Sequence, residues 1–189
     1  MADAGRVIAG RARSIRLAAP GPKTRPLGDR VKQTLFAILD PDLAGATVVD
    51  LFAGSGAAAI EALSRGAERA ILVERDAGAV SVIRTNLERT GLTERAAIVQ
   101  SDVAAWLRSV TVDESSGWSI VFLDPPYDQA ADLSAALHAL GPLVRPGTRV
   151  IAKHFWRDAP PAQVGLLASE RERRFGDTAL TFYRRTEDP

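Results

Sequence analysis

From residue 46 onward, short runs of β-branched and aliphatic residues alternate with segments whose apolar residues recur at helical spacing. Repeated strand and helix units of this kind predict a doubly wound, mostly parallel α/β sheet with helices on both faces. Residues 171–175 and 178–183, separated by Gly176 and Asp177, predict an antiparallel hairpin at the C-terminal end. The expected parallel strands are residues 47–52, 70–74, 97–99, 118–123 and 149–152.

The first 32 residues carry eight basic and two acidic residues, although the net charge of the whole chain is only +1. Excess positive charge suits contact with a phosphate backbone. Residues 6–11 and 13–17 predict two short strands of a β-hairpin, and Asp29 is expected to cap the following helix. We therefore expect a basic hairpin arm and linker at residues 1–26, followed by the main domain at residues 27–189.

Four carboxylates lie at or just beyond the carboxyl ends of the first four predicted parallel strands, namely Asp50, Glu74, Asp102 and Asp124. Ligands of such sheets bind outside the carboxyl ends of the strands. Each carboxylate has a plain structural alternative, such as helix capping for Asp102 or bracing of a turn for Asp50. Their shared position nevertheless predicts a ligand site at this edge.

The turn after the first of these strands leaves two cofactors open. Gly54, Gly56 and Ala59, with Glu74 twenty residues after Gly54, fit the glycine fingerprint of NAD binding and also allow close approach of S-adenosylmethionine (SAM). An NAD-dependent oxidoreductase is therefore one alternative. Asp50 before the glycines, Asp102 as a partner for an adenine amine, and the motif at residues 124–127 favour SAM.

That motif is Asp124-Pro125-Pro126-Tyr127, at the end of the apolar run 118–123. An exocyclic amine is a poor nucleophile until acceptors draw its N–H bonds, and a carboxylate with a proline carbonyl supplies such acceptors. Proline has no competing N–H, and a tyrosine ring can stack on a base. The pattern is typical of methyl transfer to a planar nitrogen, in RNA, in DNA adenine or cytosine, or in a protein glutamine.

Several stretches resemble class I SAM-dependent methyltransferases, which have a Rossmann-like sheet, and within them the bacterial 16S rRNA guanine-N2 methyltransferases of the RsmD type. The stretches are RVIAGR at residues 6–11, DRVKQTLF at 29–36, DLFAGSG at 50–56, EALSRG at 61–66 and DPPY at 124–127. The chain departs from the family pattern at Leu27-Gly28, Lys32-Gln33 and Lys153-His154.

The resemblance implies a role for each matching residue. Catalysis would fall to Asp124, Pro125, Pro126 and Tyr127. Cofactor binding would fall to Asp50, Phe52, Ala53, Gly54, Gly56, Glu74, Arg75, Asp102, Val103 and Asp124. RNA binding would fall to Arg6, Arg11, Arg13, Arg16, Arg25, Asp29 and Arg30. The implied partner is 16S rRNA or a small-subunit assembly particle.

The amino-acid composition argues against a metal-binding or membrane-spanning protein. The chain has no cysteine and two histidines, so we expect no metal. No apolar stretch approaches the roughly 20 residues that cross a bilayer. We therefore expect a cytoplasmic protein without a membrane partner, and a monomer.

Overall fold

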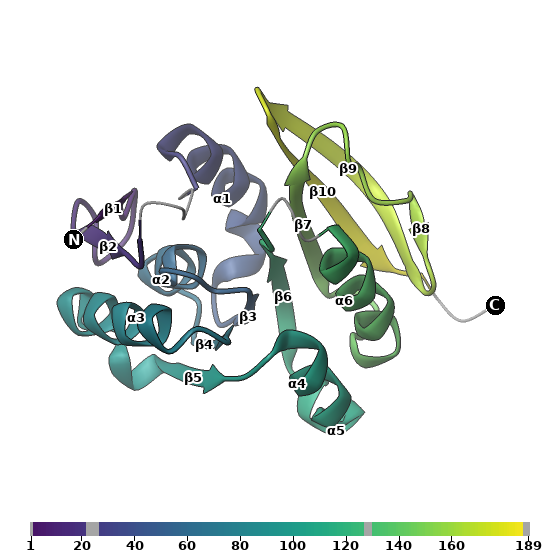
Figure 1. The fold of residues 1–189 in the computed structure, drawn as a ribbon, viewed down its shortest axis with the longest axis horizontal. Coiled ribbons are helices and arrows are strands. Elements are labelled where there is room, and N and C mark those ends of the chain that lie inside the picture. The colour runs from purple at the N-terminus through teal and green to yellow at the C-terminus, as the bar shows by residue number, and fades with distance from the viewer. Residues whose placement is uncertain (1, 22–26, 127–129, 187–189) are drawn as a thin grey trace. The chain divides into compact units, whose positions relative to one another are not determined.

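The computed structural model describes residues 2–21, 27–126 and 130–186 (Figure 1). The chain has two compact units, Met1–Ser101 and Asp102–Pro189. Strands and helices alternate along both units, and the C-terminal strands are antiparallel. The predicted α/β class is therefore confirmed.

In the first unit, three strands form a parallel sheet in the order β5, β4, β3. Their bounds are β3 Thr47–Leu51, β4 Arg69–Glu74 and β5 Ala96–Gln100. The intervening helices are α2 Ala57–Ser64 and α3 Ala77–Thr90, with a short 3-10 helix at Thr93–Arg95. All eight residues of α2 are buried. Because a fully buried short helix must pack closely on every side, its sequence is rich in alanine.

The N-terminal hairpin forms, but its strands differ from the prediction. Strand β1 covers Ala2–Arg6 and β2 covers Arg16–Ala19, and they pair antiparallel with Ala2 opposite Ala19. The predicted strands at residues 6–11 and 13–17 are therefore wrong in their bounds, since most of these residues form the turn between the two strands. That turn makes hydrogen bonds to α2, as described below.

The helix after the hairpin also differs in its cap. Helix α1 covers Asp29–Leu43, and its N-cap is Gly28, which has no side chain to cap the helix. Asp29 is the first helical residue and is paired with Arg6 and Lys32. The expected cap at Asp29 is therefore wrong because this carboxylate is engaged by cations instead.

In the second unit, the strand order is β6, β7, β10, β9, β8. Strands β6 Trp118–Leu123 and β7 Arg149–Phe155 are parallel, and the others are antiparallel. The hairpin predicted at residues 171–183 is confirmed as the facing parts of β9 Leu167–Phe175 and β10 Thr178–Arg185. The remaining elements are α4 Val103–Ser109, α5 Val112–Ser115, α6 Ala130–Leu143 and β8 Gln163–Val164.

Candidate functional site

The turn after β3 has the backbone that a ligand-binding glycine loop requires. Phe52, Gly54 and Gly56 all have positive φ, of 64°, 55° and 75°. Positive φ is unusual for a phenylalanine, and such strain tends to occur at functional sites. At Gly56, a Cβ would lie 3.0 Å from Leu72 Cδ2, so glycine is favoured there by both backbone and space.

Asp50 lies in β3, just before this turn. It is only 2% exposed, and its Oδ2 accepts a hydrogen bond from the Ala59 N–H at 3.1 Å. The first N–H groups of a helix have no partner within it, so this carboxylate satisfies one of them and braces the start of α2. The structural alternative of a turn brace therefore holds for Asp50, and a role in cofactor binding stays a prediction.

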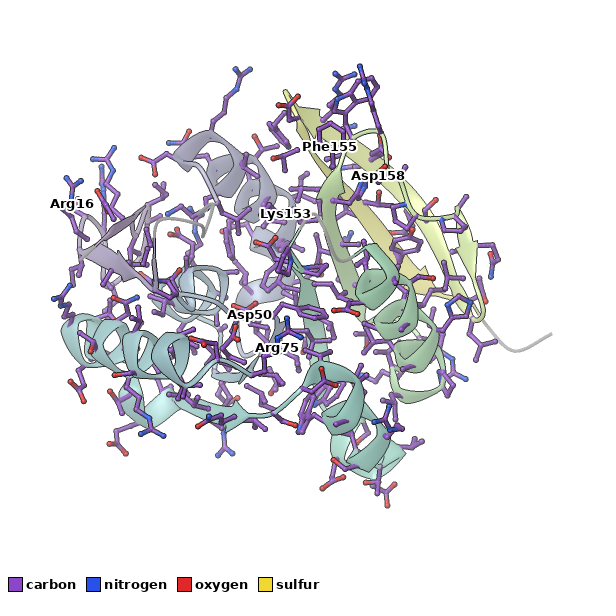
Figure 2. The ribbon with its side chains drawn as sticks, in the orientation of Figure 1. Arg16, Asp50, Arg75, Lys153, Phe155 and Asp158 are labelled. Atoms are coloured by element: carbon purple, nitrogen blue, oxygen red, sulfur yellow. The ribbon has the colours of Figure 1, made fainter. Side chains whose placement is uncertain are left out.

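Glu74 closes the turn from the next strand. Its Oε2 accepts from the Gly54 N–H at 2.9 Å, and its Oε1 accepts from the Asp76 N–H at 2.9 Å. An ionised carboxylate offers about four lone-pair sites, so acceptor capacity remains for ligand hydroxyls. A half-buried acceptor beside a close-approach glycine turn can accept hydrogen bonds from ribose hydroxyls, and the role of Glu74 in cofactor binding stays a prediction. Arg75 follows Glu74 and is exposed; it is labelled in Figure 2.

Asp102 and Val103 lie at the start of the second unit. Asp102 is the N-cap of α4, and its Oδ1 accepts from the Ala105 N–H at 3.0 Å. Its expected capping role is confirmed. The side chain is exposed, whereas Val103 is 5% exposed. Reading of an adenine by these two residues stays a prediction.

Asp124 and Lys153 form an ion pair just beyond the paired segment of β6 and β7. The last paired positions of the two strands are Leu123 and Ala152, so Asp124, directly after β6, and Lys153, within β7, are brought alongside each other. Lys153 Nζ lies 2.5 Å from Asp124 Oδ1, with side-chain exposures of 9% and 27%. Tyr127, predicted to stack on the acceptor base, lies outside the described residues.

A pocket of about 240 Å³ adjoins this ion pair within the second unit. Its walls are mostly apolar and include Pro125, Pro126 and Phe155. Lys153 and Asp158 add a cation and an acceptor to the lining, and both are labelled with Phe155 in Figure 2. Apolar pockets with a few convergent polar groups are the usual form of small-ligand sites.

The arginines predicted to bind RNA lie on the surface of the N-terminal arm. Arg6 Nε is 3.2 Å from Asp29 Oδ2, and Arg16 pairs with Asp3. Arg16 and the hydrogen bond it donates lower the pKa of the Asp3 carboxyl. The exposed arginines of the arm and of the start of α1 are Arg6, Arg11, Arg13, Arg16 and Arg30. Arg25 lies outside the described residues.

The arm is fixed to α2 by buried polar groups. Glu61 has no exposed surface, and its carboxylate accepts from the N–H groups of Ile8 at 2.7 Å and Ala9 at 3.0 Å. Ser64 Oγ accepts from the Ala12 N–H at 2.9 Å and donates to the Ala9 carbonyl at 2.6 Å. The turn of the hairpin is therefore docked on the helix that follows the glycine loop.

Asn86 of α3 connects the arm to the glycine loop. Its Oδ1 accepts from the Ala18 N–H at 2.8 Å, and its Nδ2 donates to the carbonyls of Ala18 and Ser55, each at 2.9 Å. Sequence reasoning gave no role to Glu61, Ser64 or Asn86. Glu61 and Ser64 do lie in the EALSRG stretch, but nothing in the local pattern indicates their partners some 50 residues earlier in the chain.

A family model described as conserved hypothetical protein 95 matches residues 5–184. The chain belongs to this family. It is 35% identical over 184 residues to YlbH of Bacillus subtilis, which is provisionally named an rRNA methyltransferase, and the match covers 95% of this chain and 98% of YlbH. The match to ribosomal RNA small subunit methyltransferase D of Escherichia coli is 39% identical over 123 residues, or 65% of this chain and 60% of that protein.

This member of the conserved hypothetical protein 95 family is also similar in structure to a solved methyltransferase. The methyltransferase YhhF of Escherichia coli, also provisionally named, superposes with a TM-score of 0.82 at 29% identity. The superposition covers 97% of this chain and 98% of YhhF. The predicted methyltransferase fold and the resemblance to RsmD-type proteins are both confirmed.

Two further structural findings concern metals and membranes. Within residues 2–21, 27–126 and 130–186, no three His, Asp or Glu side chains are grouped so that they could hold a metal ion. Among the same residues, every helix is too short or too polar to cross a bilayer.

Proposed function

We propose that this chain transfers a methyl group from SAM to the exocyclic N2 amine of a guanine in 16S rRNA. Membership of the family and the relation to ribosomal RNA small subunit methyltransferase D support the substrate class. The observation that carries the chemistry is Asp124, a half-buried carboxylate at the end of β6, followed directly by Pro125 and Pro126.

In the proposed reaction, Asp124 and the Pro125 carbonyl accept the two N–H bonds of the guanine N2 amine. These acceptors orient the amine lone pair for in-line attack, and most of the rate gain comes from positioning and electrostatics. SAM, when bound, supplies an activated methyl group on its sulfonium. The N–C bond forms as the S–C bond breaks, and the amine then releases one proton, for which the Asp124 carboxylate is the nearest proposed acceptor.

The glycine turn and Glu74 are assigned to SAM. The free acceptor capacity of Glu74 would bind the ribose hydroxyls, and the positive φ angles of Gly54 and Gly56 keep the turn free of side chains. Phe52, Ala53 and Asp50 shape the same turn, and Arg75 follows Glu74. Asp102 and the Val103 backbone are assigned to the adenine.

The acceptor base must leave its stack before it can react, which costs a few kcal/mol. Contacts of the arm with phosphates would offset this cost. Arg11, Arg13 and Arg30 are exposed and suited to such contacts, and Arg6, Arg16 and Asp29 belong to the same proposed surface. Arg25 is assigned to RNA binding from the resemblance alone. Exposed pairs such as Arg6 with Asp29 are worth little in water, so phosphates can displace them at small cost.

The proposal is tested with purified protein, labelled SAM, and small-subunit rRNA or particles that lack N2-methylguanosine. We expect methyl incorporation by the wild type, located to one guanine by mass mapping, and none above background by Asp124→Ala. Unchanged incorporation by Asp124→Ala would overturn the role of the motif. Label in DNA or in protein glutamine instead of rRNA would overturn the substrate.

Calorimetry tests the cofactor separately. We expect S-adenosylhomocysteine to bind and NAD to give no heat of binding. The variant Glu74→Ala should weaken S-adenosylhomocysteine by at least tenfold, because a ribose acceptor is lost. Binding of NAD in place of S-adenosylhomocysteine would instead support an oxidoreductase.

A further inference from the structure

Lys153, which forms an ion pair with Asp124, has no role in the proposed reaction. Lys153 is one of the residues at which the sequence departs from the pattern of the family it resembles. The residue is 8% exposed, and its ammonium lies 2.5 Å from Asp124 Oδ1. A lysine is rarely buried to this extent unless it is paired.

The strand register makes this contact a fixed feature of the sheet. Strands β6 and β7 pair in parallel up to Leu123 and Ala152, and on its other side β7 pairs with β10, where Lys153 is opposite Leu180. The backbone of Lys153 is therefore held by β10, one residue beyond the end of the pairing with β6. Asp124, by contrast, is the first residue beyond β6, and prolines follow it. Of the two, Lys153 is the better anchored.

The ion pair joins Lys153 to one of the two acceptor oxygens of Asp124. Lys153 engages Oδ1, and an ammonium has donors only, so it cannot compete with Asp124 for the N–H bonds of an amine. A carboxylate held at one oxygen has fewer rotamers to lose when the other oxygen accepts a bond. We propose that Lys153 is a positioning residue for methyl transfer, which orients Asp124 toward the acceptor amine.

The pocket agrees with this role. Lys153 lines it, together with the two prolines that follow Asp124. A planar acceptor bound against these walls would therefore lie beside Lys153, the residue that holds the Asp124 carboxylate. Preorganisation of this kind acts on the rate of the chemical step more than on binding.

The inference rests on the proposed function, because it assumes that Asp124 accepts the amine N–H bonds. The test compares Lys153→Met, Lys153→Arg and Asp124→Ala with the wild type. The measured quantities are kcat and KM for the rRNA substrate, the Kd of S-adenosylhomocysteine and the Tm. Arg108→Met, an exposed residue of α4 in the same unit, serves as a matched loss of one positive charge.

We expect Lys153→Met to lower kcat by roughly 10- to 100-fold, with KM and Kd within about twofold of the wild type. Lys153→Arg should recover part of the lost kcat, because a guanidinium also donates to carboxylate but with different geometry. Arg108→Met should match the wild type. A purely structural lysine would lower the Tm and leave kcat of the folded fraction unchanged.

The two failures can be told apart. If Asp124→Ala is inactive while Lys153→Met retains the wild-type kcat, the role of Lys153 is overturned and the proposed function stands. If Asp124→Ala keeps full activity, the proposed role of Asp124 is itself overturned, and the inference falls with it. Should Lys153→Met fail to fold, Lys153→Gln takes its place under the same criteria, since its shorter neutral side chain cannot form the ion pair.

Discussion

Gly10 of the arm lies directly against the last turn of α2, where a Cβ on Gly10 would be 1.9 Å from the carbonyl oxygen of Ser64. The same carbonyl accepts the Arg11 N–H at 2.8 Å, which satisfies a helix-end group. Gly10 also has a φ of +81°. We expect Gly10→Ala to destabilise the protein by about 2 kcal/mol or more, because backbone must move and a left-handed residue gains a Cβ. Urea unfolding measures this change.

Gly45 provides the matched control for Gly10. Its φ is +71°, and a Cβ there would meet no atom within 4 Å. Gly45→Ala should therefore cost only the backbone term, about 1 kcal/mol. Equal losses for the two variants would show that the close contact between Gly10 and Ser64 contributes nothing.

Glu61 should determine whether the arm stays docked. Its fully buried carboxylate accepts two backbone N–H bonds from the arm and one from Arg65 Nε at 2.7 Å. Removing the carboxylate leaves these donors without an acceptor, and the loss of one partner of a buried pair costs about 3 to 5 kcal/mol. We expect Glu61→Ala to accelerate trypsin cleavage after Arg11 and Arg13. Glu68→Ala, at an exposed position, should leave the cleavage rate unchanged.

The sequence predicted the hairpin but misplaced its strands, and the reason is physical. Alternating basic and apolar residues in 6–17 fit several registers equally well. What selects the observed one is a set of acceptors on α2, Glu61 and Ser64, more than 50 residues away. The sheet of the main domain was easier to predict, because its strands are continuous apolar runs separated by glycine or polar turns.

In the candidate site, too, some residues could be predicted from the local sequence and others depend on contacts between distant segments. Asp124, Glu74 and Asp102 could be located from the strand pattern, since each follows an apolar run. Lys153 could be noticed only as an unexpected residue. Its contact with Asp124 depends on the pairing of Leu123 with Ala152, and register between strands 30 residues apart cannot be read from either strand alone.

Asn86 should couple the stability of the arm to cofactor binding. It is fully buried, bonds both backbone groups of Ala18, and donates to the Ser55 carbonyl in the glycine loop. We expect Asn86→Ala to cost about 2 to 4 kcal/mol, because several buried groups lose their partners. The Kd of S-adenosylhomocysteine should also rise. Arg84→Ala, exposed on the same helix, should change neither quantity, and an unchanged Kd in folded Asn86→Ala would contradict the coupling.

Tyr183 should make the protein sensitive to alkaline pH. The residue has no exposed surface, its hydroxyl donates to the Pro161 carbonyl at 2.8 Å, and burial, with a smaller effect of Glu172, raises its pKa from 10.0 to about 12. In the unfolded chain the hydroxyl ionises near pH 10, so the folded state binds more protons between pH 10 and 12. The contribution of Tyr183 to stability is therefore complete below pH 10 and is lost as the pH rises through 12.

A pKa difference of this size corresponds to about 2 to 3 kcal/mol. We expect Tyr183→Phe to be less stable than the wild type by about 1 kcal/mol at neutral pH, where the hydrogen bond to Pro161 is lost, and to lose less stability than the wild type between pH 10 and 12. The chain has only two tyrosines, so Tyr127→Phe leaves Tyr183 as the single source of tyrosinate absorbance. Tyrosinate absorbance that appears near pH 10 in the folded protein would contradict the prediction. The buried hydroxyl of Tyr183 should resist ionisation until about pH 12 or until the protein unfolds.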